Sequence, residues 1–129
     1  MKELFDVHCH MVPGVDDGAA DLEESLAMLK MQHEDGVRKI IITPHYRRRM
    51  FETPAKKVHE QFLKLQEAAK KEYPDMSLYL GCELHSNMDL QDILEKRKYV
   101  TMAGSSYVLL EFSEGDSAQH IRERVYNVL

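Results

Sequence analysis

Short apolar runs alternate with stretches of helical periodicity, and this alternation constrains the fold more than any other feature of the chain. The runs Lys39–Thr43 and Ser77–Leu80 are typical of strands, and the first is apolar enough for a sheet that is buried on both faces. Between them, the apolar residues from Val58 to Ala69 recur at the spacing of one helix face. Strands separated by helices form parallel sheets with right-handed crossovers. The sequence therefore predicts an α/β fold.

Capping and turn signals predict where the helices begin and end. Asp21, with Glu24 three residues later, indicates the start of a first helix, and Gly36 is suited to its end. Thr53 followed by Pro54 predicts the N-cap of a second helix. The further elements that we expect are strands over 4–8, 99–102 and 106–111, a short helix around 90–94, and a helix over 117–129.

Size and composition narrow the class of protein. A chain of 129 residues fits one domain, and its 43% hydrophobic and 30% charged content is that of a globular protein. The formal net charge of -5 argues against a nucleic-acid partner. No run reaches the roughly 18 apolar residues of a membrane span, and we find no signal peptide. Cys9 and Cys82 are too few for a disulfide framework, and we expect both to be buried. The expected location is the cytoplasm.

Imidazole or carboxyl groups end each of the four main predicted strands. His8 and His10 follow the first strand, His45 the second, Glu83 the third and Glu111 the fourth. The carboxyl ends of parallel strands converge on one rim, where active sites lie. In an extended segment the His-x-His spacing directs both imidazoles to the same face. Mixed imidazole and carboxylate ligands favour manganese, iron or zinc, and such clusters activate water and hold phosphoryl oxygens.

The two aspartates that follow this His-x-His motif allow two interpretations. Asp16 and Asp17 precede Gly18, a pattern that favours a turn. The alternative is that one aspartate binds a metal ion while the other shapes the loop.

Three consecutive arginines follow His45 and leave a similar choice. Arg47, Arg48 and Arg49 are either a solvated charged surface or a site that recruits phosphate or an acidic phosphotyrosine segment, because guanidinium groups match phosphate geometry. His85 lies two residues after Glu83, close enough to be considered for the same rim.

Six segments together resemble the PHP (polymerase and histidinol phosphatase) family, and most closely its bacterial protein-tyrosine phosphatase branch. Their order and approximate spacing agree with the family over essentially the whole chain. Enzymes of this branch accompany tyrosine autokinases in capsular and exopolysaccharide synthesis. The segments are Asp-Val-His-Cys-His at 6–10, Pro-Gly-Val-Asp-Asp-Gly at 13–18, Asp-Leu-Glu-Glu-Ser at 21–25, Thr-Pro-His at 43–45, Gly-Cys-Glu at 81–83 and Leu-Glu-Phe at 110–112.

The resemblance implies a distorted β/α barrel and a site of up to three metal ions, usually manganese, with iron or zinc as alternatives. A hydroxide held between two ions would attack phosphorus, so the metal ligands would also carry the catalysis. The resemblance favours Asp17 over Asp16 as a ligand. The implied ligands are His8 and His10 for one ion, Glu83 bridging it to a second ion that Glu111 also binds, and Asp17 with His45 for the third.

The same resemblance predicts how the chain is organised and what it acts on. Residues 1–129 would form a single domain that represents about the first half of the barrel and is incomplete at its C-terminus, because the family's later His, Asp–His and arginine motifs are not found in this sequence. An unclosed sheet exposes edge strands and one face, so we expect a homo-oligomer.

The implied function is hydrolysis of phosphotyrosine in a protein, namely a bacterial tyrosine autokinase. The Asp-Asp-Gly and Asp-Leu-Glu-Glu-Ser stretches favour this over a small-molecule phosphoesterase of the same family. The remaining alternative is a catalytically inert fragment that acts only as an assembly unit. Metal content and hydrolysis of a phosphate ester discriminate the inert fragment from the enzymes.

Overall fold

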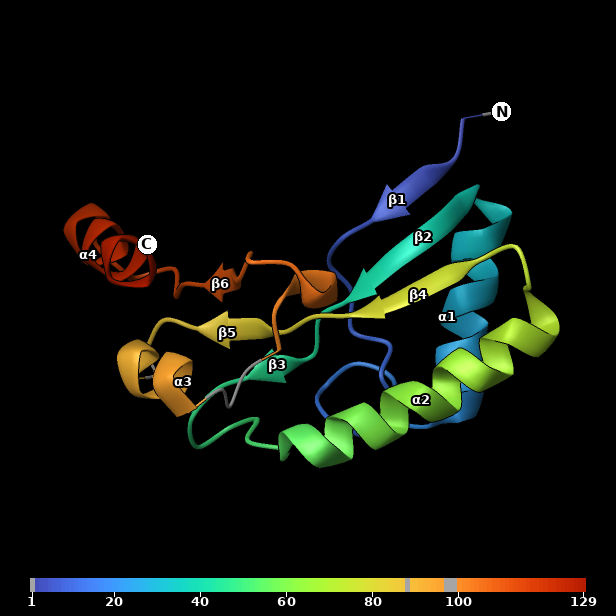
Figure 1. Cartoon of the computed structure of the whole chain (residues 1–129), viewed down its shortest axis with the longest axis horizontal. Helices are drawn as coiled ribbons and strands as arrows, with labels where there is room; N and C mark the ends of the chain where they lie inside the picture. Colours follow the sequence, from blue (N-terminus) through green and yellow to red (C-terminus); the bar gives the residue numbers. More distant parts are fainter. Residues whose placement is uncertain (1, 88, 97–99) are drawn as a thin grey trace.

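The computed structural model describes residues 2–87, 89–96 and 100–129, and its strands alternate with helices as the sequence predicts (Figure 1). The elements are β1 Leu4–Asp6, α1 Leu22–Glu34, β2 Val37–Ile42, β3 His45–Tyr46, α2 Ala55–Glu72, β4 Ser77–Leu80, β5 Glu83–His85, α3 Leu90–Lys96, a 3₁₀ turn at Met102–Gly104, β6 Leu109–Glu111 and α4 Ala118–Val128.

Two three-stranded parallel sheets replace the single sheet that we expected. The strand orders are β1-β2-β4 and β3-β5-β6. The chain runs from β2 into β3 through Pro44, and from β4 into β5 through Gly81 and Cys82 (Figure 1). Backbone bonds continue across both breaks, from Gly81 N–H to the Ile42 carbonyl (2.8 Å) and from Glu83 N–H to the Pro44 carbonyl (2.9 Å). Each pair of short strands therefore acts as one long strand with a bend.

The first sheet is buried on one face only, which corrects the expectation of burial on both faces. Residues of β2 and β4 alternate, so that Ile40 and Leu78 are buried while Lys39 and Tyr79 are exposed. The buried face packs on α1 and α2, and the predicted stripe of α2 supplies much of this core. The buried residues of α2 are Val58, Phe62, Leu65 and Ala69.

Both caps of α1 are confirmed, whereas the predicted start of α2 is wrong. Asp21 accepts the Glu24 N–H at 2.8 Å, and Gly36 follows the helix with φ +94°. Helix α2 begins at Ala55 with Pro54 as N-cap. The Thr53 hydroxyl instead donates to the Val15 carbonyl at 2.9 Å. Thr53 therefore fastens the loop that follows β1 rather than capping a helix.

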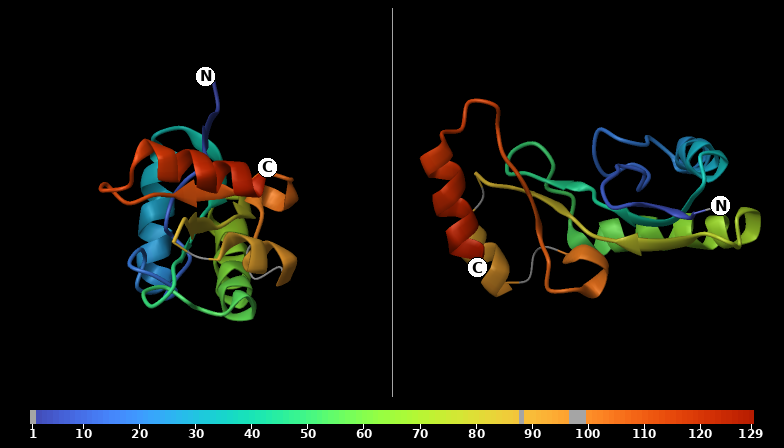
Figure 2. Two further views of the ribbon diagram at one scale, coloured as in Figure 1. Left: turned by 90° about the vertical axis from the view of Figure 1, so that its left-hand side faces the viewer. Right: turned by 90° about the horizontal axis from the view of Figure 1, so that it is seen from above.

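The second sheet carries α3 and α4, which lie side by side at one end of the molecule (Figure 2). Its core is small and includes Leu84, Leu90 and Ile93. The predicted strand over 99–102 is wrong for the described residues Val100 to Met102, which form a loop and the start of the 3₁₀ turn, and Tyr99 lies outside the described residues. In the described ranges, no helix is both long and apolar enough to cross a membrane.

Candidate metal centre

Five of the six predicted ligands converge where the two sheets meet. His8 and His10 lie in the extended segment after β1, His45 begins β3, Glu83 begins β5 and Glu111 ends β6. Strand pairing places His45 beside Glu83, and Glu111 beside His85. The sequence argument placed Glu83 at the end of a strand, whereas it begins a new one. The convergence survives because β5 continues β4 across a short break.

A single oxygen of Glu83 is the centre of this cluster. Its Oε2 atom lies 3.2 Å from His8 Nε2, 3.1 Å from His10 Nε2 and 3.2 Å from His45 Nδ1. His45 Nδ1 also lies 3.4 Å from Glu111 Oε2. The Glu83 side chain is only 9% exposed, so water does not solvate this oxygen freely. Three imidazoles and one buried carboxylate oxygen therefore share a very small volume.

Three polar atoms of this cluster have no hydrogen-bond partner in the described residues, and they show whether a metal ion fits the site. His45 Nδ1, Glu83 Oε2 and Glu111 Oε2 are buried without a hydrogen-bond partner in the described part of the chain. Each such atom costs about 1–3 kcal/mol when it stays unsatisfied. Atoms that bind one ion at about 2.1 Å lie roughly 3.0–3.4 Å apart, which is the spacing seen here. The donor set therefore fits a divalent cation.

Two groups of three ligands share Glu83. One is His8, His10 and Glu83, and the other is His45, Glu83 and Glu111. In each group the ligand atoms lie within 4.8 Å of one another. A carboxylate that belongs to both groups can bridge two ions, as in two-metal sites that clamp a phosphoryl group.

Asp16 orients His10. The sequence argument had left open whether this residue shapes a turn or binds a metal ion. Its Oδ2 atom lies 3.1 Å from His10 Nδ1 and accepts the His45 backbone N–H at 2.9 Å, while Oδ1 accepts the Gly18 N–H at 2.9 Å. A proton on Nδ1 leaves the Nε2 lone pair directed at Glu83, the arrangement in which a carboxylate fixes the tautomer of a metal-binding histidine. Asp16 thus shapes the loop and orients a ligand.

The contact between His10 and Asp16 shifts the pKa of both groups. The hydrogen bond with Asp16 raises the pKa of His10 above its usual 6.5, against the opposing effect of burial. Burial raises the pKa of Asp16, but the hydrogen bonds from His10, His45 and Gly18 outweigh it, so the pKa ends below its usual 3.8.

Asp17 lies at the exposed edge of the cluster. Its side chain is 66% exposed, and Oδ1 lies 3.6 Å from His45 Nε2. That distance is too long for a hydrogen bond and leaves room for a shared ion. The pairing of Asp17 with His45 at a third ion stays a prediction, and His45 Nδ1 faces Glu83 and Glu111 instead.

The loop from His10 to Ala19 is held tightly enough to fix these groups. The Ala19 N–H donates to the His10 carbonyl at 3.0 Å, and a Cβ atom at Gly18 would collide with that same carbonyl. The Gln61 side chain donates to the Pro13 carbonyl at 3.0 Å. A glycine at position 18 is therefore required by close approach of the backbone.

The three arginines lie in a tight hairpin directly after β3. Arg47 and Phe51 form an antiparallel bridge, and Arg49 has φ +65°. Arg48 and Arg49 are exposed, in the same hairpin whose Phe51 ring stacks on His45. Their role as phosphate-binding residues stays a prediction.

His85 is not available as a ligand. It lies on the same face of β5 as Glu83, yet it is 2% exposed. Its Nδ1 accepts the Asn87 N–H at 3.0 Å, so Nε2–H donates to the Ser113 hydroxyl at 3.1 Å. Both nitrogens are occupied, and His85 connects the loops that follow β5 and β6.

Cys82 is buried, as predicted, whereas Cys9 is only half-buried and packs against the first core. Burial raises the pKa of Cys9 and of Cys82 to about 12, so neither is a thiolate near neutral pH.

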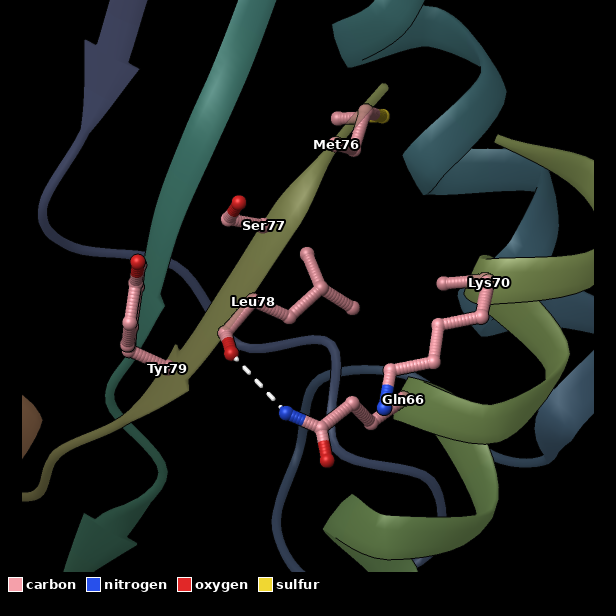
Figure 3. A pocket seen from close by; sticks show the side chains of 7 residues that line it. Gln66, Lys70, Met76, Ser77, Leu78 and Tyr79 are labelled. Atoms are coloured by element: carbon pink, nitrogen blue, oxygen red, sulfur yellow. Dashed lines mark hydrogen bonds between the residues drawn. The ribbon is translucent and has the colours of Figure 1, made fainter. Parts of the chain in front are cut away.

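A pocket of about 230 Å³ lies between α2 and β4, away from the ligands. Gln66 Nε2 donates to the Leu78 carbonyl there at 3.2 Å (Figure 3). Gln66 thereby occupies one acceptor on the outer edge of β4.

Comparison with known proteins shows which family the chain resembles. The sequence model of the family described as "Capsular polysaccharide synthesis, CpsB/CapC" matches residues 4–129. The chain is 40% identical to the tyrosine-protein phosphatase CpsB of Streptococcus pneumoniae over 126 residues, which are 98% of this chain and 52% of that protein. It is 27% identical to the tyrosine-protein phosphatase YwqE of Bacillus subtilis, covering 97% of this chain and 49% of that protein.

The fold agrees with the sequence comparison. A crystal structure from work on YwqE of Bacillus subtilis and CpsB of Streptococcus pneumoniae, described as metal-dependent tyrosine phosphatases, matches with a TM-score of 0.86 and 27% identity. The match covers 97% of this chain and 51% of that one. The chain spans about half the length of the curated relatives that it matches. From the family model over residues 4–129, together with this fold, we conclude that the chain belongs to the CpsB/CapC family of capsular polysaccharide synthesis.

Proposed function

We propose that this chain provides the manganese-binding ligands of a phosphotyrosine-protein phosphatase that acts on a tyrosine autokinase in polysaccharide synthesis. The observation that carries the proposal is the group of three buried atoms without hydrogen bonds, on His45, Glu83 and Glu111. The relatives named as tyrosine-protein phosphatases support the reaction, and the work that describes CpsB and YwqE as metal-dependent supports the cofactor.

The proposed ligands are the six residues predicted from the sequence. His8, His10 and Glu83 would hold one ion, and Glu83 with Glu111 and His45 a second, with Asp17 beside His45 at a third. Divalent ions bound there would lower the pKa of a water molecule and offset the charge on phosphoryl oxygens. Asp16 would hold the proton on His10 Nδ1 throughout, so that Nε2 stays a ligand.

The arginine hairpin is proposed to attract the phosphorylated segment. Replacing Arg47, Arg48 and Arg49 together by alanine should raise the Michaelis constant for a phosphotyrosyl peptide and leave the turnover number nearly unchanged. Unchanged Michaelis constants would show that these arginines are only a solvated surface.

Manganese titration of the metal-free protein tests the proposal. Electron paramagnetic resonance detects the free Mn²⁺ ion and thereby measures binding, which we expect for the wild type. Glu83→Gln should lower the Mn²⁺ affinity at least about 100-fold, because it removes a ligand that both groups share. Glu114→Gln, an exposed carboxylate in the loop before α4, is the matched control.

Hydrolysis then separates the remaining alternatives. Turnover of a phosphotyrosyl peptide in preference to histidinol phosphate supports the tyrosine phosphatase. The reverse preference supports the small-molecule phosphoesterase. Manganese binding without turnover of either ester supports the assembly unit, and absence of manganese binding rejects the metal centre.

A further inference from the structure

The hairpin after β3 places an aromatic ring against the metal-ligand cluster. The Arg47 N–H donates to the Phe51 carbonyl and the Phe51 N–H to the Arg47 carbonyl, both at 2.8 Å, and the Met50 N–H donates to Arg47 at 3.1 Å. These backbone bonds fix where Phe51 leaves the hairpin. They do not involve its side chain, so a substitution at Phe51 leaves them intact.

The Phe51 ring stacks on the imidazole of His45. The ring centroids lie 5.0 Å apart and the planes differ by 18°. His45 also stacks on His10, with centroids 4.3 Å apart and an angle of 20°. An imidazole with two nearly parallel neighbours cannot rotate about its side-chain bond without losing both contacts.

His45 lacks the hydrogen bond that normally orients a metal-binding histidine. Such histidines usually donate their second ring N–H to a carboxylate or carbonyl group, as His10 does to Asp16. Within the described residues, His45 Nδ1 has no hydrogen-bond partner, and Nε2 lies 3.6 Å from the nearest Asp17 oxygen. Apart from the Glu83 and Glu111 carboxylates that would share its ion, ring stacking on Phe51 and His10 is the contact that sets its orientation.

We infer that Phe51 is a positioning residue of the metal centre, which holds the His45 imidazole in the plane from which it binds an ion. The inference rests on the proposed metal centre. It assigns to Phe51 the task that Asp16 performs for His10. The arginines of the hairpin and the ring that orients His45 thus belong to the same short segment, which links phosphate recruitment to the shape of the site.

The first test uses the metal-free protein and asks whether the Phe51 ring stacks on His45 in solution. In nuclear magnetic resonance spectra, the ring protons of His45 should be shifted by the Phe51 ring. Phe51→Leu, which keeps an apolar side chain of similar reach, should remove this shift, and Phe51→Tyr should retain it. Met50→Ala, an exposed position in the same hairpin, is the control and should change nothing.

The second test measures Mn²⁺ affinity in the same variants. Phe51→Leu should weaken binding at the His45 position roughly tenfold, the usual effect of removing a group that orients a ligand. Phe51→Tyr and Met50→Ala should bind as the wild type does. The free energy of unfolding of the metal-free protein should be nearly equal in Phe51→Leu and Phe51→Tyr, which separates positioning from a general loss of stability.

Two results would overturn the inference, and they can be told apart. If the wild type binds Mn²⁺ and Phe51→Leu binds it equally tightly, Phe51 does not position His45 while the metal centre stands. If the wild type binds no Mn²⁺ at all, both the metal centre and the role of Phe51 are rejected.

Discussion

At the scale of single residues, Asp16 has the most connected role in the site. It joins the loop after β1 to β3 and fixes the His10 tautomer through one buried carboxylate. Because the pKa of His10 is raised in the folded protein, protonated His10 contributes to the free energy of unfolding. This contribution is fully present below pH 6.5 and is lost as the pH rises through the folded pKa. Because the pKa of Asp16 is lowered, the contribution of ionised Asp16 to the free energy of unfolding is fully present above pH 3.8 and is lost as the pH falls through the folded pKa.

The ion pair should therefore stabilise the metal-free protein most between these two limits. Asp16→Asn should lower the free energy of unfolding by about 1.5–3 kcal/mol near pH 5.5, the range for hydrogen bonds to charged groups. The loss should become smaller as the pH rises through the raised pKa of His10, because the imidazole then loses its charge. Urea unfolding in the presence of a chelator measures the loss at each pH. A loss that stays equal as the pH rises would mean that the charged pair does not form.

At the scale of elements, α2 carries the sheet that positions the site. Leu65 is fully buried in the core that also contains residues of β2 and β4, whereas Leu63 on the same helix is 46% exposed. Leu65→Ala should cost about 2–5 kcal/mol through the lost contacts and the cavity. Leu63→Ala is the matched control and should change the free energy of unfolding by about 0.5 kcal/mol. Similar effects of both substitutions on thermal or urea unfolding would contradict this packing.

The elements that repeat a strong pattern were predictable from the sequence. The buried stripe of α2, the N-cap Asp21 and the bounds of β4 agree with their predictions because each follows from local spacing. The division into two sheets could not be predicted from local spacing. It depends on breaks at Pro44 and Gly81, whose effect on strand pairing is set by tertiary contacts.

The candidate site shows the same division between local and tertiary information. Strand-end placement was enough to bring His8, His10, His45, Glu83 and Glu111 together. The distinct roles of Asp16 and Phe51 depend on distances across the fold, 3.1 Å to His10 and 5.0 Å to the His45 ring. No sequence spacing encodes those distances. The sequence argument considered Asp16 as a turn residue or a ligand but not as the partner of His10, and an aromatic residue in the hairpin after His45 is the signal that could have indicated Phe51.

At the scale of the whole molecule, one face of the first sheet leaves apolar side chains exposed. Phe5, Val7 and Tyr79 are 63%, 57% and 42% exposed there, beside Lys39, whose ammonium lies 5.1 Å from the Phe5 ring centroid. The helices α1 and α2 pack on the opposite face. Exposed apolar side chains grouped on one sheet face favour association.

We therefore propose that two copies of this chain associate through that face. Sedimentation velocity at micromolar concentration should detect a dimer, and Phe5→Ser with Tyr79→Ser should shift it to monomer. Met31→Ser, an exposed position on α1, is the control and should leave the dimer intact. A wild-type protein that sediments only as a monomer would contradict the proposal.

The location of bound manganese tests the account most directly. Crystals grown with Mn²⁺ and measured at a wavelength where manganese scatters anomalously should show one peak among His8, His10 and Glu83. A second peak should lie among His45, Glu83 and Glu111, within bonding distance of the shared Glu83 carboxylate. Crystals in which manganese lies only elsewhere, with no anomalous peak beside Glu83, would contradict the central claim.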